Sequence, residues 1–80
     1  MKIQILFFGI TTDLVGASSL GLELTEASTV LNFKSLLKEK YPQLKNIDSF
    51  AIAVNESYAT DELVLKENDT VAIIPPVSGG

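Results

Sequence analysis

Residues 20–42 read LGLELTEASTVLNFKSLLKEKYP, and the hydrophobic period changes within this stretch. Leu20, Leu22 and Leu24 alternate with other residues, a pattern typical of a strand with one solvated face. From position 28 onward the apolar residues recur at spacings of three and four, which is typical of a helix. The stretch therefore predicts a strand followed by one amphipathic helix of about three turns.

The ends of this helix are marked in the sequence. Ser28 or Thr29 can cap its N-terminus. Pro42 disfavours helical geometry at the preceding residue and ends the helix near Tyr41. The predicted apolar face consists of Val30, Phe33, Leu37 and Tyr41, widened by Leu31 and Leu36. The predicted polar side consists of Asn32, Lys34, Ser35, Lys38 and Glu39.

Three further segments have strand character, namely residues 2–8, 50–54 and 70–74. Residues 9–19 are rich in Thr, Asp, Gly and Ser and are expected to form a loop or wide turn. Residues 55–57 are expected to form a turn, and residues 58–65 either a short edge strand around 63–65 or a packed loop.

The predicted order is strand, strand, helix, strand, weak strand, strand. A single helix has to cover one face of one sheet, because both elements need to bury an apolar side. This order favours an α+β fold of the β-grasp type, with a mixed sheet of four to five strands and the last strand beside the first. Residues 1–80 are expected to form a single domain with a flexible C-terminal tail at 75–80.

Composition argues against an active site within the chain. Its 80 residues include no Cys and no His, which excludes thiolate–imidazole pairs, Ser-His-Asp triads and thiolate or imidazole metal ligands. Asp61 and Glu62 are adjacent carboxylates, for which a solvated turn is expected. The glycines fit no nucleotide-binding fingerprint. We therefore expect no bound cofactor and no metal, and we expect no catalytic residues belonging to the isolated chain.

Charge and hydropathy limit the possible partners. The net charge is −4, with a local +3 in residues 32–47 and a local −5 from Asp48 onward. Nucleic acid is a poor partner for such a chain, because phosphate binding depends on Lys and Arg clusters. A partner with a basic surface fits better, although the acids could serve solubility alone. No stretch approaches transmembrane length and no cleavage pattern follows the first strand, so we expect no membrane association and a cytoplasmic location.

The predicted sheet has one face that no helix covers. Alternation places Ile3, Ile5, Phe7, Val71 and Ile73 toward the helix and Leu6, Phe8, Ala72 and Ile74 away from it. An uncovered apolar patch often marks a partner site. Leu6 is expected to be partly covered by the loops at 9–19 and 58–65. For Phe8 and Ile74, near the exit of the tail, both coverage by loops and docking of a partner remain open.

The chain ends in residues 73–80, which read IIPPVSGG. Pro75 and Pro76 cannot donate ladder hydrogen bonds, so they stop the sheet and hold the next residues extended. The six residues from Pro75 span about 20 Å when extended. Glycine has no Cβ, so the tip fits a narrow pocket. Its reactive group is the α-carboxylate of Gly80, which adenylation by ATP would convert into an electrophile for sulfur. The alternative is a frayed terminus without function.

Four segments of the chain resemble the small, sulfur carrier subunits of molybdopterin synthase, a ubiquitin-like family with a C-terminal Gly-Gly. The segments are Ile5-Leu6-Phe7-Phe8-Gly9, Ser28-Thr29-Val30, Ala53-Val54-Asn55 and Ile74-Pro75-Pro76-Val77-Ser78-Gly79-Gly80. The last is the most specific. Two departures are the Thr11-Thr12 pair, where relatives often carry Arg, and Glu67-Asn68-Asp69, where relatives often carry Gly. The first puts one partner-facing salt bridge in doubt.

The resemblance implies a cycle centred on Gly80. An adenylyltransferase related to ubiquitin-activating enzymes would use ATP and magnesium to form a glycyl adenylate, and a sulfur donor enzyme would then give the thiocarboxylate. The tail would deliver sulfur to a pyranopterin precursor in the large synthase subunit, within a heterotetramer whose catalytic residues belong to the large subunit. The implied partner-binding residues are Phe8, Ile74, Pro75, Pro76, Val77, Ser78 and Gly79.

Two alternatives stay open at this point. The first is a sulfur carrier of the same fold for another pathway, such as thiamin, tRNA thiolation or cysteine synthesis. The second is a ubiquitin-like tag or a plain interaction module. Fold alone does not separate these functions.

Overall fold

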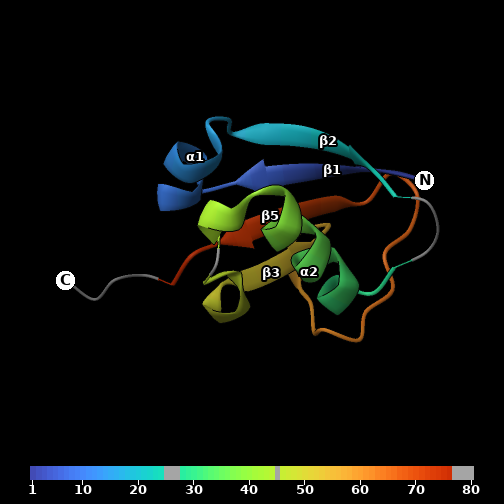
Figure 1. Ribbon diagram of the computed structural model, residues 1–80. Coiled ribbons are helices and arrows are strands. Elements are labelled where there is room, and N and C mark those ends of the chain that lie inside the picture. Colours follow the sequence, from blue (N-terminus) through green and yellow to red (C-terminus); the bar gives the residue numbers. More distant parts are fainter. Residues whose placement is uncertain (25–27, 45, 77–80) are drawn as a thin grey trace.

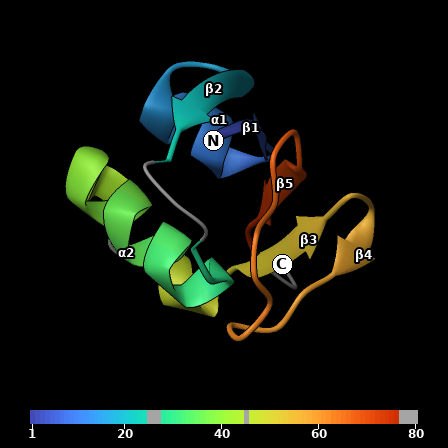
Figure 2. The same ribbon diagram turned by 90° about the vertical axis from the view of Figure 1, so that its right-hand side faces the viewer.

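A curved sheet lies against one long helix in the computed structural model, which describes residues 1–24, 28–44 and 46–76 (Figures 1 and 2). The strands are β1 (Lys2–Phe7), β2 (Ser19–Glu23), β3 (Ala51–Val54), β4 (Ser57–Tyr58) and β5 (Thr70–Ile74). The α-helices are α1 (Ile10–Val15) and α2 (Val30–Lys40). Two 3-10 turns, η1 (Pro42–Leu44) and η2 (Ile47–Ser49), connect α2 to β3.

The strand order in the sheet is β2-β1-β5-β3-β4. β1 pairs with β5 in parallel, and the other pairs are antiparallel. The last strand therefore enters the middle of the sheet beside the first. This topology confirms the predicted mixed sheet and β-grasp arrangement.

The core fills the space between the sheet and α2. Ile3, Ile5 and Phe7 of β1 alternate inward and are buried, as are Val71 and Ile73 of β5. From α2, Val30, Phe33 and Leu37 are completely inaccessible to solvent. Burying side chains of this size stabilises the fold by about 1.5–3 kcal/mol each. The predicted inward face of both strands is confirmed.

Both ends of α2 lie where the sequence placed them. Thr29 caps the N-terminus, since its Oγ1 accepts a hydrogen bond from Asn32 N at 3.2 Å. Asn32 Oδ1 in turn accepts from Thr29 N at 3.3 Å, which completes a capping box. At the other end, Tyr41 N donates to Leu37 O at 2.8 Å, immediately before Pro42.

The prediction that Lys34 lies on the polar side of α2 was wrong. The prediction that Leu31 and Leu36 widen the apolar face was also wrong. Lys34 is buried, whereas Leu31 and Leu36 are 49% and 38% exposed. Lys34 follows Val30 by four positions and therefore lies beside it on the inward side of the helix. Leu31 points away from the sheet, so its apolar character did not indicate its burial.

Residues 9–19 were expected to form a loop, but they contain the short helix α1. Thr11 is fully buried at its start. Its Oγ1 accepts a hydrogen bond from Phe8 N at 3.0 Å and donates to Phe8 O. Gly16 ends the helix in a left-handed conformation, φ +86°, with its N–H bonded to Thr12 O at 2.8 Å. α1 lies at the end of the sheet from which β5 leaves (Figure 1).

Residues 59–65 form a packed loop, which is one of the two alternatives that the sequence left open for this segment. Thr29 and Val64 form an isolated β-bridge. Around it, Val30 N donates to Leu63 O at 2.9 Å and Leu31 N donates to Asp61 O at 3.1 Å. The loop thus accepts hydrogen bonds from the first turn of α2, whose amides have no partner within the helix. The edge strand is instead β4, two residues after β3.

Candidate functional site

A row of four side chains crosses the face of the sheet that α2 leaves open. The strand register aligns Leu6 with Ala72, Ala72 with Ala53, and Ala53 with Tyr58. Two alanines therefore occupy the middle of the row, with larger side chains at both ends. Because a methyl group fills little of the space between larger neighbours, the row is low in its centre.

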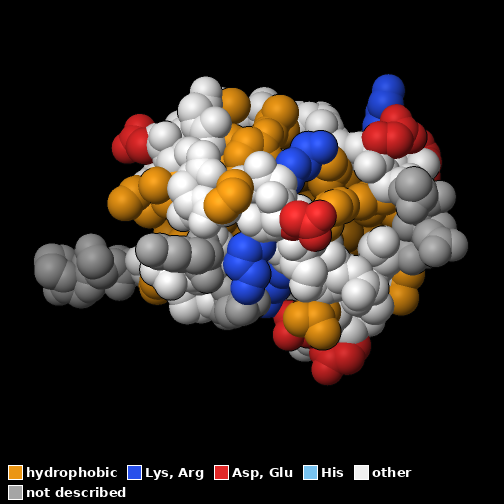
Figure 3. All heavy atoms as spheres, in the orientation of Figure 1, with side chains coloured by type: hydrophobic (Ala, Val, Ile, Leu, Met, Phe, Trp, Pro, Cys, Tyr) orange, Lys and Arg blue, Asp and Glu red, His pale blue; other side chains and the backbone are white. Residues whose placement is uncertain are grey.

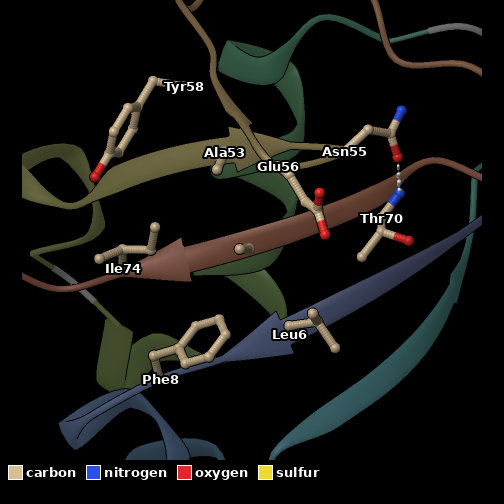
Figure 4. A pocket seen from close by; sticks show the side chains of 9 residues that line it. Leu6, Phe8, Ala53, Asn55, Glu56, Tyr58, Thr70 and Ile74 are labelled. Atoms are coloured by element: carbon tan, nitrogen blue, oxygen red, sulfur yellow. Dashed lines mark hydrogen bonds between the residues drawn. The ribbon is translucent and has the colours of Figure 1, made fainter.

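An open apolar hollow of about 660 Å³ lies over this row (Figure 4). Figure 4 shows Phe8 and Ile74 at one end of the hollow, and Asn55 and Thr70 at the other. Phe8 is 47% exposed and Tyr58 is 80% exposed. The lining residues are Leu6, Phe8, Ala53, Asn55, Glu56, Tyr58, Thr70, Ala72 and Ile74. The hollow can receive apolar side chains of a partner.

The structure brings together the two docking residues predicted from the sequence, Phe8 and Ile74. Phe8 follows the last residue of β1 and Ile74 is the last residue of β5. Pro75 is half-buried directly after it, and Pro76 is exposed. The tail therefore begins at the rim of the hollow. The predicted residues Val77, Ser78, Gly79 and Gly80 lie outside the described part of the chain.

Leu6 lies in the same hollow as Phe8. It is half-buried, and the lining contains Tyr58 but no residue of 9–19. Leu6 is thus partly covered, as expected, but of the two segments 9–19 and 58–65 only Tyr58 contributes to the lining of the hollow. Sequence reasoning also left Ala53 and Tyr58 out of the site. Their place follows from the β3–β4 hairpin, whose pairing the sequence did not reveal.

A network of polar side chains holds the far end of the hollow in shape. Asn55 and Glu56 have φ of +51° and +73° and form the two-residue turn between β3 and β4. Asn55 Oδ1 accepts from Thr70 N at 3.0 Å, and its Nδ2 donates to Asp69 Oδ1 at 2.9 Å. Asp69 Oδ2 accepts from Lys66 N at 2.7 Å. These bonds tie the hairpin turn to the start of β5.

Most of the residues that line the hollow are apolar. In residues 1–24, 28–44 and 46–76, no three His, Cys, Asp or Glu side chains gather as a metal ion would require. No helix in these same ranges has the length and apolar character needed to cross a membrane. On the α2 side, charged and apolar side chains are interspersed (Figure 3).

Comparison with known sequences assigns the chain to a family. The model of the ThiS family matches residues 5–80. The chain belongs to this family. Curated relatives of this ThiS-family chain are molybdopterin synthase sulfur carrier subunits. That of Arabidopsis thaliana is 36% identical over 100% of this chain and 84% of the relative. That of Dictyostelium discoideum is 35% identical over 99% of this chain and 96% of the relative. The resemblance to the sulfur carrier subunits of molybdopterin synthase, noted in the sequence, is thus confirmed.

Solved structures of similar proteins share the fold of the ThiS-family chain. A protein described as molybdopterin converting factor subunit 1 from Pyrococcus furiosus has a TM-score of 0.87 at 27% identity, covering 96% of this chain and 99% of that one. The small archaeal modifier protein 1 of Methanosarcina acetivorans has a TM-score of 0.83 at 26% identity, covering 99% of this chain and 96% of that one. A complex of subunits 1 and 2 of molybdopterin-converting factor from Helicobacter pylori gives 0.70 at 23% identity, covering 100% of both chains.

Proposed function

We propose that this chain carries sulfur on the carboxylate of Gly80 and delivers it to the large subunit of molybdopterin synthase. The observation that carries the proposal is the place where β5 ends. β5 ends at the rim of the apolar hollow, and Pro75 and Pro76 lead from there toward the Gly79-Gly80 end of the sequence. A partner bound over the hollow would therefore also receive the tail.

Loading consists of two successive displacements, the first at the α-phosphorus of ATP and the second at the carbonyl carbon of Gly80. An oxygen of Gly80 attacks the α-phosphate of ATP, pyrophosphate leaves, and a glycyl adenylate forms on a magnesium-dependent adenylyltransferase. Hydrosulfide released by a donor enzyme then attacks the carbonyl carbon, AMP leaves, and loss of the sulfur-bound proton gives the thiocarboxylate. Gly79 has no side chain to obstruct the entry of this end into a narrow site. Each step acts on the chain terminus and requires no catalytic side chain from this chain.

Delivery requires docking, for which the hollow is suited. Phe8 is a half-exposed aromatic side chain beside the tail exit, and aromatic anchors often dominate binding energy at interfaces. The partner proposed here is the large subunit, in keeping with the two-subunit complex of the Helicobacter pylori protein. The catalytic residues for sulfur transfer to the pyranopterin precursor would belong to that subunit. We expect the reaction to take place in the cytoplasm.

The test is the intact mass of the protein after incubation with ATP, magnesium, the host's adenylyltransferase and a sulfide source. We expect a mass gain that corresponds to oxygen replaced by sulfur and maps to Gly80. A variant lacking Gly80 is expected to keep the fold, because the described strands end at Ile74, but to gain no mass. Equal gains in both proteins, or no gain in either beside an active control carrier, would contradict the proposal.

A modifier function is the second candidate, supported by the likeness to the small archaeal modifier protein 1 of Methanosarcina acetivorans. In that case the activated Gly80 would form amide bonds with lysines of other proteins. Peptide mapping of host proteins would detect a branched Gly80–lysine linkage. The carrier function would be favoured if no such linkage is found and the loaded chain, together with the large subunit, transfers sulfur to the pyranopterin precursor.

A further inference from the structure

We infer that Gly9 is a positioning residue that sets the direction in which the C-terminal tail leaves the sheet. The inference rests on the proposed function and assigns a part in it to a residue that lies far from Gly80 in the sequence. Gly9 follows Phe8 and is the N-cap of α1. Neither composition nor spacing singles it out, because its importance arises from a contact across the β1–β5 pair.

The backbone at Gly9 has a conformation that other residues avoid. Its φ is +58° and its ψ is −137°. A Cβ clashes with the neighbouring backbone in this part of conformational space, which glycine occupies readily. The turn lets the chain pass directly from β1 into α1, where Thr12 N donates to Gly9 O at 3.1 Å.

The space beside Gly9 is occupied by the ring of Pro75. A Cβ built on Gly9 would lie 3.1 Å from Pro75 Cγ and 3.9 Å from Pro75 Cδ. The register explains the contact, since Phe7 pairs with Ile73 and each of the two contacting residues lies two positions further along its chain. The first residue of the tail thus packs on a backbone surface that is flat only because position 9 lacks a side chain.

This contact holds Pro75, the first residue of the tail, in a place where hydrogen bonds cannot. Proline has no N–H to donate, and its φ is held near −65° by its ring. The position of the ring therefore sets the direction in which the chain leaves Pro75. A side chain at position 9 would push the ring by a few tenths of an ångström, and this would change the direction in which the chain leaves Pro75. A misplacement of about 1 Å at a reacting group can cost about 100-fold in rate.

The experiment compares Gly9→Ala with Gly16→Ala in the complete protein. Gly16 also has a positive φ, +86°, but a Cβ there would meet nothing within 4 Å. Gly16→Ala therefore strains the backbone without touching the tail. With the mass assay, we expect wild type and Gly16→Ala to acquire sulfur at similar rates, and Gly9→Ala at least about tenfold more slowly. Equal rates for all three would overturn the inference, and thermal melts report whether each variant is folded.

Two further measurements separate a redirected tail from a general loss of structure. In a double-mutant cycle, Gly9→Ala should have a much smaller effect on the loading rate when Pro75→Ala has removed the ring. Additive effects would contradict the inference. In NMR spectra of the wild-type protein, Nuclear Overhauser contacts should join the Gly9 α protons to the Pro75 ring protons, and their absence would refute the contact. The NMR measurement tests the contact even if the wild-type protein acquires no sulfur. A lack of sulfur loading in the wild-type protein would count against the proposed function and not against the contact.

Discussion

Lys34 Nζ lies 2.8 Å from Asp61 Oδ1, and this ion pair joins the middle of α2 to the loop that follows β4. The lysine side chain is only 10% exposed, whereas that of Asp61 is 48% exposed. A buried ammonium group needs a partner, because removing it from water is costly. The pair therefore holds the loop against the helix, together with the backbone hydrogen bond from Val30 N to Leu63 O.

We expect Asp61→Ala to lower the free energy of unfolding by about 1–2 kcal/mol, because Lys34 would be left without its partner. The estimate is below that for a fully buried pair, since water reaches Asp61. Chemical denaturation measures the change. The neighbouring exposed Glu62 provides the control, and Glu62→Ala should leave the unfolding curve unchanged. Equal curves for both variants would show that the ion pair contributes nothing.

Phe8→Ala is expected to weaken binding of the large subunit by about 1–3 kcal/mol, which is the range for an aromatic anchor at an interface. Stability should change little, since the side chain is half exposed. Calorimetric titration gives the dissociation constant. Leu31 is exposed to a similar degree, 49% against 47%, but lies on α2. If Leu31→Ala weakens the complex as much as Phe8→Ala does, the open face of the sheet is not the docking surface.

Ala72→Leu tests the hollow by filling it. Ala72 lies in the low centre of the row and is half-buried, so a larger side chain there can point into open space without disturbing the core. We expect an unchanged or slightly higher melting temperature and a loss of large-subunit binding of about tenfold or more. Full binding by a folded Ala72→Leu variant would mean that the partner does not enter the hollow.

Asn68→Gly is expected to stabilise the protein slightly, and Asn68→Ala to destabilise it by about 1 kcal/mol. Asn68 has φ +68°, a left-handed conformation that Gly adopts freely, Asn tolerates and Ala disfavours. The melting temperature should be highest with Gly at position 68, lower with Asn and lowest with Ala. Any order that places Ala first would contradict the strain argument.

The strands and α2 could be predicted because their signals are periodic and long. Val30, Phe33 and Leu37 mark one helix face, and Pro42 marks its end. The short helix α1 could not be predicted, since six residues hold too few apolar positions for a period and Thr11 is buried through hydrogen bonds instead of apolar character. Lys34 was misassigned for a related reason, because its burial depends on a partner 27 positions away.

The open face was predictable from alternation alone, which placed Phe8 and Ile74 together. The hollow itself was not, because its depth depends on which residue stands opposite Ala72. That register is set by pairing across three strands. The contact between Gly9 and Pro75 is equally a product of register. The roles of Val77, Ser78, Gly79 and Gly80 remain predictions, because these residues lie outside the described ranges.

The parallel pairing of the first and last strands has a mechanical consequence. The proposed adenylyltransferase would pull β5 along the direction of the strand as it draws the tail into its active site. β5 is bonded on both sides, to β1 and to β3, and the rungs of both ladders run across this direction. The hydrogen bonds of both ladders thus share the load in shear. A force that separated the strands from one end would instead break these bonds one after another. The domain can be held by its end without being unravelled.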